Sequence, residues 1–322
     1  MKHRLAGSLA ALCLFAAEPA LGQGCGLTKV ASYPIQYLDH GRVVIAMKIA
    51  GKDMLMAVDT GAWFSTLDSD TVDALKLPHQ SHTDQFVAYD SRGRRTSEVA
   101  TAPSMEIGPL EVGSVDFIVA AHGSKFGDGV SGLLGANVLK HFDLDFDFAN
   151  GTFNIFAQDH CPGQVVYWTT GGSAKIPFKF NGASITVPVT LDGHEMEAIL
   201  DSGASASTIS QPIANKIYSV VPGGAGVTAR DYTDENGDKQ TDYTHAFGTL
   251  SFGGVTIANP RLHLIPDKMG QAAQADNARQ DYTNMPTLHL PNLLLGIEEL
   301  KHLHLYIAYQ EKTLYVTAAT AH

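Results

Sequence analysis

The fold of this chain is decided by the sequence MLMAVDTGAWFSTL at residues 54–67, which returns in altered form as MEAILDSGASASTI at residues 196–209. In both copies an apolar run leads into Asp, a hydroxyl residue, Gly and Ala. Such a run is typical of a buried strand, and glycine permits backbone angles and close approaches that other residues resist. Each copy therefore predicts a carboxylate, Asp59 or Asp201, at the end of a buried strand. A single Asp-Thr/Ser-Gly triplet is common by chance, but two in matching contexts are a strong signal.

The match extends beyond the two aspartates when the sequence is shifted so that Asp59 falls on Asp201. Before each aspartate, apolar residues alternate on both sides of a turn that contains glycine, at residues 50–53 and 192–194. This pattern predicts a β-hairpin whose second strand delivers the aspartate.

A second pair of matching segments lies farther along the chain. Each has two apolar residues and a glycine, at residues 133–135 and 294–296, followed by a short helical stretch and an alternating strand pair. The shift that places Gly135 on Gly296 is larger than the one that places Asp59 on Asp201, so the second half carries an insertion. We place much of this insertion at residues 270–287, which are polar and without pattern.

The chain is therefore predicted to be all-β, with two related lobes. We place the N-terminal lobe at residues 30–157 and the C-terminal lobe at residues 174–318. Between them, residues 158–173 combine Pro and Gly with a short apolar strand, which indicates a connector that packs under both lobes. At 322 residues the chain is long enough to bury roughly 75% of its unfolded surface in such an arrangement.

Composition excludes several classes of protein. Hydrophobic residues at 44% and charged residues at 17% describe a globular chain. The formal net charge of −11 argues against binding to a nucleic-acid backbone. After residue 22 no segment approaches the roughly 20 apolar residues of a membrane span. We expect neither a nucleic-acid partner nor a membrane span.

The first residues resemble a secretory signal peptide. Lys2 and Arg4 give a positive start, residues 5–17 form a short apolar core, and residues 20–22 resemble a cleavage site. The alternative is a buried N-terminal helix. We favour cleavage near Gly22 and an exported protein, either secreted or periplasmic.

Two of the three cysteines would remain after cleavage, Cys25 and Cys161. Two cysteines in an exported protein predict a disulfide bond. Cys25 could instead carry a lipid anchor, but residues 22–24 lack the Leu-Ala/Ser-Gly/Ala pattern that precedes a lipoprotein cysteine. We therefore favour the disulfide.

Together these motifs resemble the aspartic peptidase superfamily, and the resemblance covers most of the chain. It rests on residues 59–62, residues 201–204 and the two apolar-apolar-Gly elements. Two lobes in one chain are similar to pepsin, whereas Ala62 and Ala204 after the glycines are similar to retroviral-type peptidases. The resemblance is strongest to a duplicated, retropepsin-like enzyme, and the simple signal without a visible propeptide leads us to expect a bacterial source. It implies the acid protease fold, with two closed β-barrel-like lobes and an active-site cleft between them.

The resemblance also implies that Asp59 and Asp201 are a catalytic pair. Two carboxyls about 3 Å apart cannot both ionise, so they share a proton. The ionised carboxyl can then activate water while the protonated one donates to the substrate carbonyl. The neighbouring hydroxyls would hold the two loops together, and the glycines would turn the chain and offer amides to the carboxylates. The predicted support residues are Thr60, Gly61, Ala62, Ser202, Gly203 and Ala204.

A hairpin is also predicted at residues 87–99, with Gly93 at its tip. In the family a flap hairpin closes over the substrate, and Tyr89 is the best candidate for its aromatic contact. A plain surface hairpin with an incidental Tyr89 is the alternative. Residues 231–242 form the matching hairpin of the second lobe.

Other chemistries lack their motifs in this sequence. His79, His82, His302 and His304 have no third ligand at convincing spacing, so we expect no metal site. The serines within residues 202–207 lack the second glycine of Gly-x-Ser-x-Gly. No phosphate-binding loop or dinucleotide fingerprint is present, so we expect no cofactor.

The predicted function is that of an exported aspartic endopeptidase that acts on polypeptides in extended conformation. The predicted form is a monomer whose dyad is built within one chain, because a short connector keeps the two lobes adjacent. Two alternatives stay open: a catalytically inactive peptide-binding protein on the same fold, and ordinary polar turns at the two Asp-x-Gly triplets. The presence of both aspartates favours the enzyme.

Overall fold

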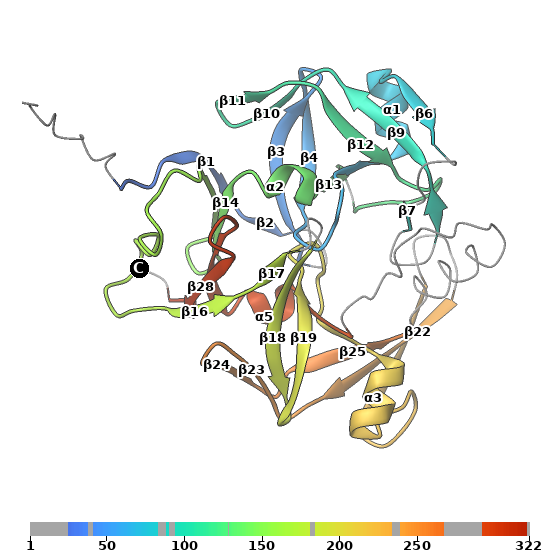
Figure 1. Ribbon diagram of the computed structural model, residues 1–322. Coiled ribbons are helices and arrows are strands. Elements are labelled where there is room, and N and C mark those ends of the chain that lie inside the picture. Colours follow the sequence, from blue (N-terminus) through green and yellow to red (C-terminus); the bar gives the residue numbers. More distant parts are fainter. Residues whose placement is uncertain are drawn as a thin grey trace, which may run out of the picture.

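Two β-rich lobes and a sheet shared between them make up the computed structural model of this chain (Figure 1). The structure describes residues 25–37, 41–82, 88–89, 94–127, 129–180, 184–233, 239–266 and 292–320. The predicted signal peptide, Gly93 and the segment at residues 270–287 lie outside these ranges. Among the described helices, none is long and apolar enough to cross a membrane.

The first lobe is built on the predicted hairpin of β3 (Val43–Ile49) and β4 (Lys52–Val58). β13 (Val130–Leu134) runs parallel to β4, and β5 (Thr66–Leu67) pairs antiparallel with β13. The other strands of this ten-stranded sheet are β2 (Gln36–Tyr37), β6 (His79–Ser81), β9 (Glu98–Ala102), β10 (Met105–Ile107), β11 (Leu110–Val112) and β12 (Val115–Val119).

The second lobe repeats the arrangement. β18 (Ile185–Leu191) and β19 (His194–Leu200) form the hairpin, β26 (Leu293–Leu295) runs parallel to β19, and β20 (Thr208–Ser210) pairs antiparallel with β26. The other strands of this ten-stranded sheet are β17 (Lys179–Phe180), β21 (Val227–Thr233), β22 (Lys239–Ala246), β23 (Thr249–Phe252), β24 (Val255–Ala258) and β25 (Arg261–Ile265).

Both hairpins turn through two residues with positive φ. These are Ala50 (48°) and Gly51 (72°) in the first lobe, and Asp192 (45°) and Gly193 (82°) in the second. Positive φ at both central residues defines the type I′ turn, whose twist matches that of the flanking strands. The two hairpins predicted from the repeat are thus confirmed.

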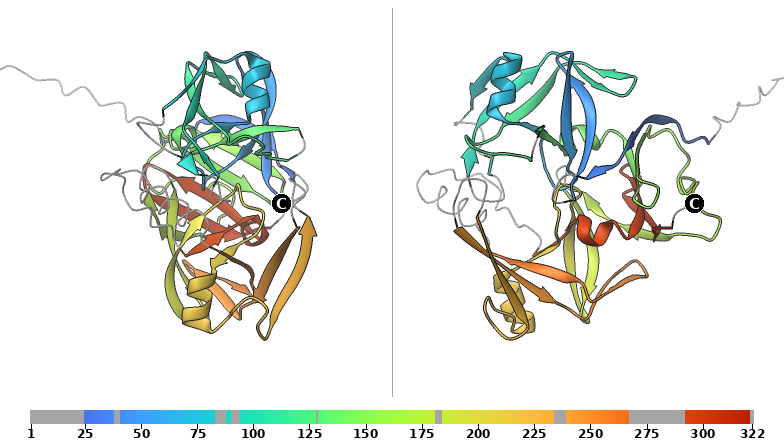
Figure 2. Two further views of the ribbon diagram at one scale, coloured as in Figure 1. Left: turned by 90° about the vertical axis from the view of Figure 1, so that its right-hand side faces the viewer. Right: turned by 180° about the vertical axis from the view of Figure 1, so that it is seen from behind.

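Short helices follow the same two-fold pattern. α2 (Ala136–Leu139) and α5 (Ile297–Leu300) each begin directly after an apolar-apolar-Gly strand, as predicted. α1 (Ser69–Leu75) and α3 (Gln211–Tyr218) lie at opposite ends of the molecule (Figures 1 and 2). One hydrophobic cluster runs through both lobes and the shared sheet. The all-β fold with two related lobes is therefore confirmed.

The last hairpin of each lobe pairs with that of the other lobe, which the sequence did not predict. β14 (Asp143–Asp147) runs antiparallel to β27 (Leu303–Ala308), with Leu144 opposite Ile307 and Phe146 opposite Leu305. The order of the six-stranded shared sheet is β1-β15-β14-β27-β28-β16. Its strands are β1 (Lys29–Pro34), β14 (Asp143–Asp147), β15 (Thr152–Phe156), β16 (Ala174–Pro177), β27 (Leu303–Ala308) and β28 (Thr313–Ala318). The two lobes are thus joined by continuous backbone pairing.

The connector at residues 158–173 contains no strand, and the expectation of one was wrong. Its apolar residues are held by packing, since Val165 is fully buried in a cluster with Phe156, Tyr306 and Tyr315. The predicted disulfide between Cys25 and Cys161 is confirmed.

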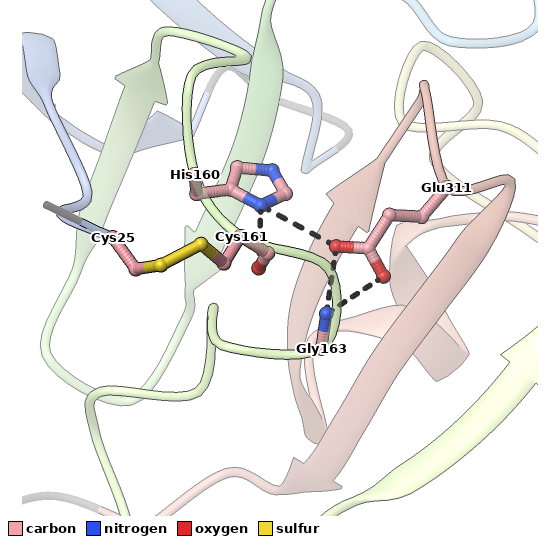
Figure 3. Close-up of a disulfide and its surroundings, with 5 residues drawn as sticks. All are labelled: Cys25, His160, Cys161, Gly163 and Glu311. Atoms are coloured by element: carbon pink, nitrogen blue, oxygen red, sulfur yellow. Dashed lines mark hydrogen bonds and ion pairs between the residues drawn. A yellow bond between two sulfur atoms is a disulfide. The ribbon is translucent and has the colours of Figure 1, made fainter. Parts of the chain in front are cut away.

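A polar network beside the disulfide fixes the connector to the shared sheet (Figure 3). Nε2 of His160 lies 2.5 Å from Asp143 Oδ2, and its Nδ1 lies 3.4 Å from Glu311 Oε1. Glu311 also accepts hydrogen bonds from the Gly163 N–H (3.1 Å) and the Tyr315 hydroxyl (2.6 Å). Burial raises the pKa of Asp143, and the hydrogen bond to His160 opposes this rise.

Candidate active site

Each of the two aspartates directly follows the second strand of its hairpin, and strand pairing fixes its backbone. The Asp59 N–H donates to the Leu134 carbonyl of β13 (3.0 Å), and the Asp201 N–H donates to the Leu295 carbonyl of β26 (2.9 Å). The parallel pairing of β4 with β13 and of β19 with β26 therefore sets where each carboxyl group leaves its sheet.

Backbone amides of the following residues hold each carboxyl group. Oδ1 of Asp59 accepts hydrogen bonds from the N–H groups of Gly61 (3.0 Å) and Ala62 (2.7 Å). The second loop repeats this at Asp201, with the N–H groups of Gly203 (2.8 Å) and Ala204 (3.1 Å). Such bonds stabilise the ionised form of a carboxyl group and fix its orientation.

The two glycines show how closely the loops approach each other. A Cβ placed on Gly61 would lie 2.4 Å from Cγ of Asp201, and one placed on Gly203 would lie 2.2 Å from Cγ of Asp59. Any side chain at either position would therefore collide with the opposite carboxyl group. Glycine is required at both positions because each loop packs against the aspartate of the other lobe.

Two hydroxyl groups tie the loops together across the lobe boundary. Oγ1 of Thr60 donates to the Leu200 carbonyl (2.7 Å) and accepts from the Ser202 N–H (3.0 Å). In the reciprocal pair, Oγ of Ser202 donates to the Val58 carbonyl (2.7 Å) and accepts from the Thr60 N–H (3.2 Å). Thr60 and Ser202 are 1% and 3% exposed, so these four bonds are shielded from water.

Burial and mutual repulsion raise the affinity of the aspartate pair for a proton. The pKa of Asp201 is raised well above its ordinary value, first by burial and then by the charge of Asp59. Burial also raises the pKa of Asp59, against the hydrogen bonds from the Ala62 and Gly61 amides. The pair therefore keeps one proton at a pH where an ordinary aspartate is ionised, and that proton belongs to the pair.

Two buried serines support the site and were not singled out for this from the sequence. Oγ of Ser65 accepts from the Gly135 N–H (3.0 Å) and donates to Asn137 Oδ1 (2.8 Å). Ser207, considered above only as part of a serine motif, accepts from the Gly296 N–H (2.9 Å) and donates to Glu299. Both serines are fully buried and fasten the apolar-apolar-Gly strand to the aspartate loop. The repeat could have identified them, because the shift that places Asp59 on Asp201 also places Ser65 on Ser207.

The flap prediction involves residues that the structure describes only in part. Tyr89 lies on β7 (Ala88–Tyr89), which pairs with β8 (Arg95–Thr96), and Gly93 lies outside the described residues. β7 is on the side of the first lobe that faces β22 of the second (Figure 1). The contact of Tyr89 with a substrate therefore stays a prediction. Within the described ranges, no group of three or more His, Cys, Asp or Glu side chains could hold a metal ion.

Comparison with protein families identifies each half of the chain separately. A model described as "gag-polyprotein putative aspartyl protease" matches residues 45–141, and one described as "Aspartyl protease" matches residues 187–298. Each match contains one aspartate loop and its apolar-apolar-Gly strand. A search of curated protein sequences found no match.

Comparison with solved structures gives matches that cover most of the chain. The aspartic proteinase from Irpex lacteus is 15% identical, with 90% of this chain and 98% of that chain covered and a TM-score of 0.50. Basic 7S globulin from soybean is 10% identical, with 92% and 96% covered and a TM-score of 0.49. At such low identity, the likeness to the proteinase concerns the fold alone.

Proposed function

We propose that this chain, which belongs to the aspartic peptidase superfamily and carries two aspartyl protease domains in tandem, is an exported aspartic endopeptidase. The observation that carries the proposal is the meeting of the two aspartates. Asp59 and Asp201 come from different lobes, and each carboxyl lies against the glycine of the opposite loop. The two halves of one chain thus supply two carboxyls side by side, one able to act as base toward water and the other as acid toward the amide carbonyl.

The proposed reaction uses one ionised and one protonated carboxyl. The ionised carboxylate takes a proton from a water molecule, whose oxygen attacks the carbonyl carbon of the scissile peptide. At the same time the protonated carboxyl donates its proton to the carbonyl oxygen, giving a tetrahedral diol. The carboxyl that took the water proton then gives it to the amide nitrogen, while the other carboxyl takes a proton from a hydroxyl of the diol. Cleavage of the C–N bond releases two peptides and leaves the pair singly protonated again. The amides of Ala62 and Ala204 hold the carboxyls in place throughout.

The raised pKa of Asp201 sets the direction of the pH dependence. Activity needs the singly protonated pair, so it falls when the pair loses its last proton at higher pH and when it gains a second at lower pH. Ala62 and Ala204 have no hydroxyl to donate a further hydrogen bond to the carboxylates, which leaves the pair titrating higher than with serine or threonine there. We expect a bell-shaped profile with its maximum at mildly acidic pH.

Export and the monomeric state belong to the same proposal. Export is supported by the signal-like residues 1–22 and by the disulfide between Cys25 and Cys161, because disulfides persist in oxidising compartments. The monomer is supported by the four hydrogen bonds between the aspartate loops and by the sheet shared between the lobes. The substrate would be a polypeptide in extended conformation.

The test is digestion of an unfolded protein at several pH values, with and without pepstatin. We expect the wild-type chain to cleave it and pepstatin to stop the cleavage. Asp59→Asn and Asp201→Asn should each lower kcat by more than roughly 100-fold, since each removes one partner in proton transfer. Asp53→Asn is the matched control, because it makes the same change at an exposed position of β4.

Three results would contradict the proposal. They are no cleavage by the wild-type chain, cleavage that survives either active-site substitution, and equal losses in the Asp53→Asn control. Binding of unfolded chains without any hydrolysis would favour the catalytically inactive peptide-binding alternative.

A further inference from the structure

Two exposed aromatic residues directly follow the first aspartate loop. The side chains of Trp63 and Phe64 are 38% and 50% exposed, and they are neighbours in sequence. Large apolar side chains scattered singly over a surface need no explanation, but adjacent ones beside a site do. The N–H of Ala62, the residue just before Trp63, donates to Oδ1 of Asp59 (2.7 Å). With consecutive Cα atoms about 3.8 Å apart, both aromatic residues start within two residue lengths of that amide.

The backbone of this segment is held by several contacts. The carbonyls of Ala62 and Trp63 accept hydrogen bonds from the N–H groups of Ala136 (2.9 Å) and Asn137 (3.2 Å). A Cβ on Gly135 would lie 2.6 Å from the carbonyl carbon of Phe64, so the strand before α2 packs directly against the segment. The two exposed aromatic side chains are therefore attached to a backbone that these contacts hold in place.

The equivalent segment of the second lobe shows whether the fold requires aromatic residues after the aspartate loop. The repeat places Ser205 and Ala206 where the first lobe has Trp63 and Phe64. The Ser205 carbonyl accepts a hydrogen bond from the Glu298 N–H (2.9 Å), as that of Trp63 does from Asn137. The same backbone is thus built with small side chains in one lobe, so the aromatic residues of the other are not needed to form it.

We propose that Trp63 and Phe64 form an apolar subsite that receives a large apolar side chain of the peptide on the first-lobe side of the aspartate pair. They would be specificity-determining residues, and the equivalent positions of the second lobe hold the small residues Ser205 and Ala206. This inference rests on the proposed function, because the subsite is defined by its place beside Asp59. Its physical basis is burial of apolar surface: the exposed rings lose contact with water when a substrate side chain packs on them.

The first arm of the test maps cleavage sites in a digest of unfolded proteins. The wild-type chain should show a preference for large apolar residues at one position beside the scissile bond. In the double variant Trp63→Ser/Phe64→Ala, which installs small residues of the kind found in the second lobe, this preference should disappear. Leu110→Ser is the control, since Leu110 is an exposed apolar residue of β11 in the same lobe (36% exposed). An unchanged preference in the double variant would overturn the inference.

Kinetics make the same comparison quantitative. The substrates are a ten-residue peptide with a central Phe pair and a twin with a central Ser pair, both without Trp and Tyr. For the Phe peptide, kcat/KM should fall roughly 10- to 100-fold in the double variant, the range expected for lost apolar contacts in a specificity pocket. The value for the Ser twin should change less than about threefold. Equal losses for both peptides would contradict a subsite.

The second arm measures binding without hydrolysis, so that its failure can be told from failure of the proposed function. In an Asp201→Asn background, the Phe peptide should shift the tryptophan emission to shorter wavelength, and the shift should be absent when Trp63→Ser is added. If the wild-type chain cleaves nothing but this shift occurs, the subsite stands and the proposed function falls. If cleavage occurs but neither the shift nor the preference does, the proposed function stands and the subsite falls.

Discussion

Thr60→Val tests whether the hydroxyl bonds between the aspartate loops hold the two lobes in register. Valine keeps the branched shape of threonine but can neither donate nor accept a hydrogen bond. The Thr60 hydroxyl makes two such bonds, to the Leu200 carbonyl (2.7 Å) and from the Ser202 N–H (3.0 Å). Valine would leave both of these backbone groups without their partner, and Thr60 is only 1% exposed, so water cannot easily replace it.

The magnitude follows from these two groups. A buried polar group left unpaired costs about 1–3 kcal/mol, so two of them cost about 2–6 kcal/mol. The extra buried methyl of valine returns up to about 1 kcal/mol. We therefore expect the free energy of unfolding to fall by about 1–6 kcal/mol, against the roughly 5–15 kcal/mol that is typical of native proteins.

Urea unfolding at fixed pH measures this change, with Thr60→Ser as the matched control. Serine keeps the hydroxyl and loses one methyl group, so it should cost only about 1 kcal/mol. Thr60→Val should also lower kcat, because the loops that carry Asp59 and Asp201 lose part of their mutual alignment. A Thr60→Val protein more stable than Thr60→Ser would refute the reasoning.

Three further predictions concern the charge, the disulfide and the chain topology. Because the pKa of Asp201 is raised, the folded chain keeps a proton that the unfolded chain has released. The free energy of unfolding should therefore fall as pH rises above about 4, by up to about 1.4 kcal/mol per pH unit. Asp201→Asn should flatten this slope, and an equal slope in the wild-type and variant proteins would argue against the raised pKa. The Cys25–Cys161 bond closes a separation of 136 residues, so the free energy of unfolding of Cys25→Ser/Cys161→Ser should be lower by on the order of 4–5 kcal/mol. Two free thiols in the unreduced wild-type protein would disprove the bond. Asp59→Asn and Asp201→Asn chains that are mixed and refolded together should stay inactive, whereas activity that grows with concentration would show exchanged lobes.

The sequence predicted the elements whose signals are local. Alternating apolar residues around Gly51 and Gly193 specify both the strands and their turns, so the hairpins and their aspartates could be placed from the sequence alone. The repeat added what a single motif could not, because one common shift placed Asp59 and Asp201, and the strands before them, in equivalent positions.

The pairing of β14 with β27 could not be predicted in the same way. Alternation shows that a strand has a buried face, but it does not identify the neighbouring strand, and Leu144 and Ile307 belong to opposite halves of the chain. The short apolar stretch around Val165 was interpreted as a strand for a related reason. A run of apolar residues indicates that the segment is buried, but not that it pairs as a strand. Here the segment is buried by side-chain packing, without backbone pairing to another strand.

The hydrogen bonds to the two aspartates are symmetric, whereas the side chains beside them differ between the two lobes. Each carboxyl receives two backbone hydrogen bonds from its own loop, and the two loops hold each other through reciprocal bonds, so these hydrogen bonds do not by themselves select one aspartate as base. A peptide has a direction, however, and the second lobe has the small residues Ser205 and Ala206 at the positions equivalent to Trp63 and Phe64. A substrate anchored at Trp63 and Phe64 would lie in a single direction across the pair. That direction would decide which carboxyl faces the carbonyl oxygen, and so which one must hold the proton when the peptide bond is attacked.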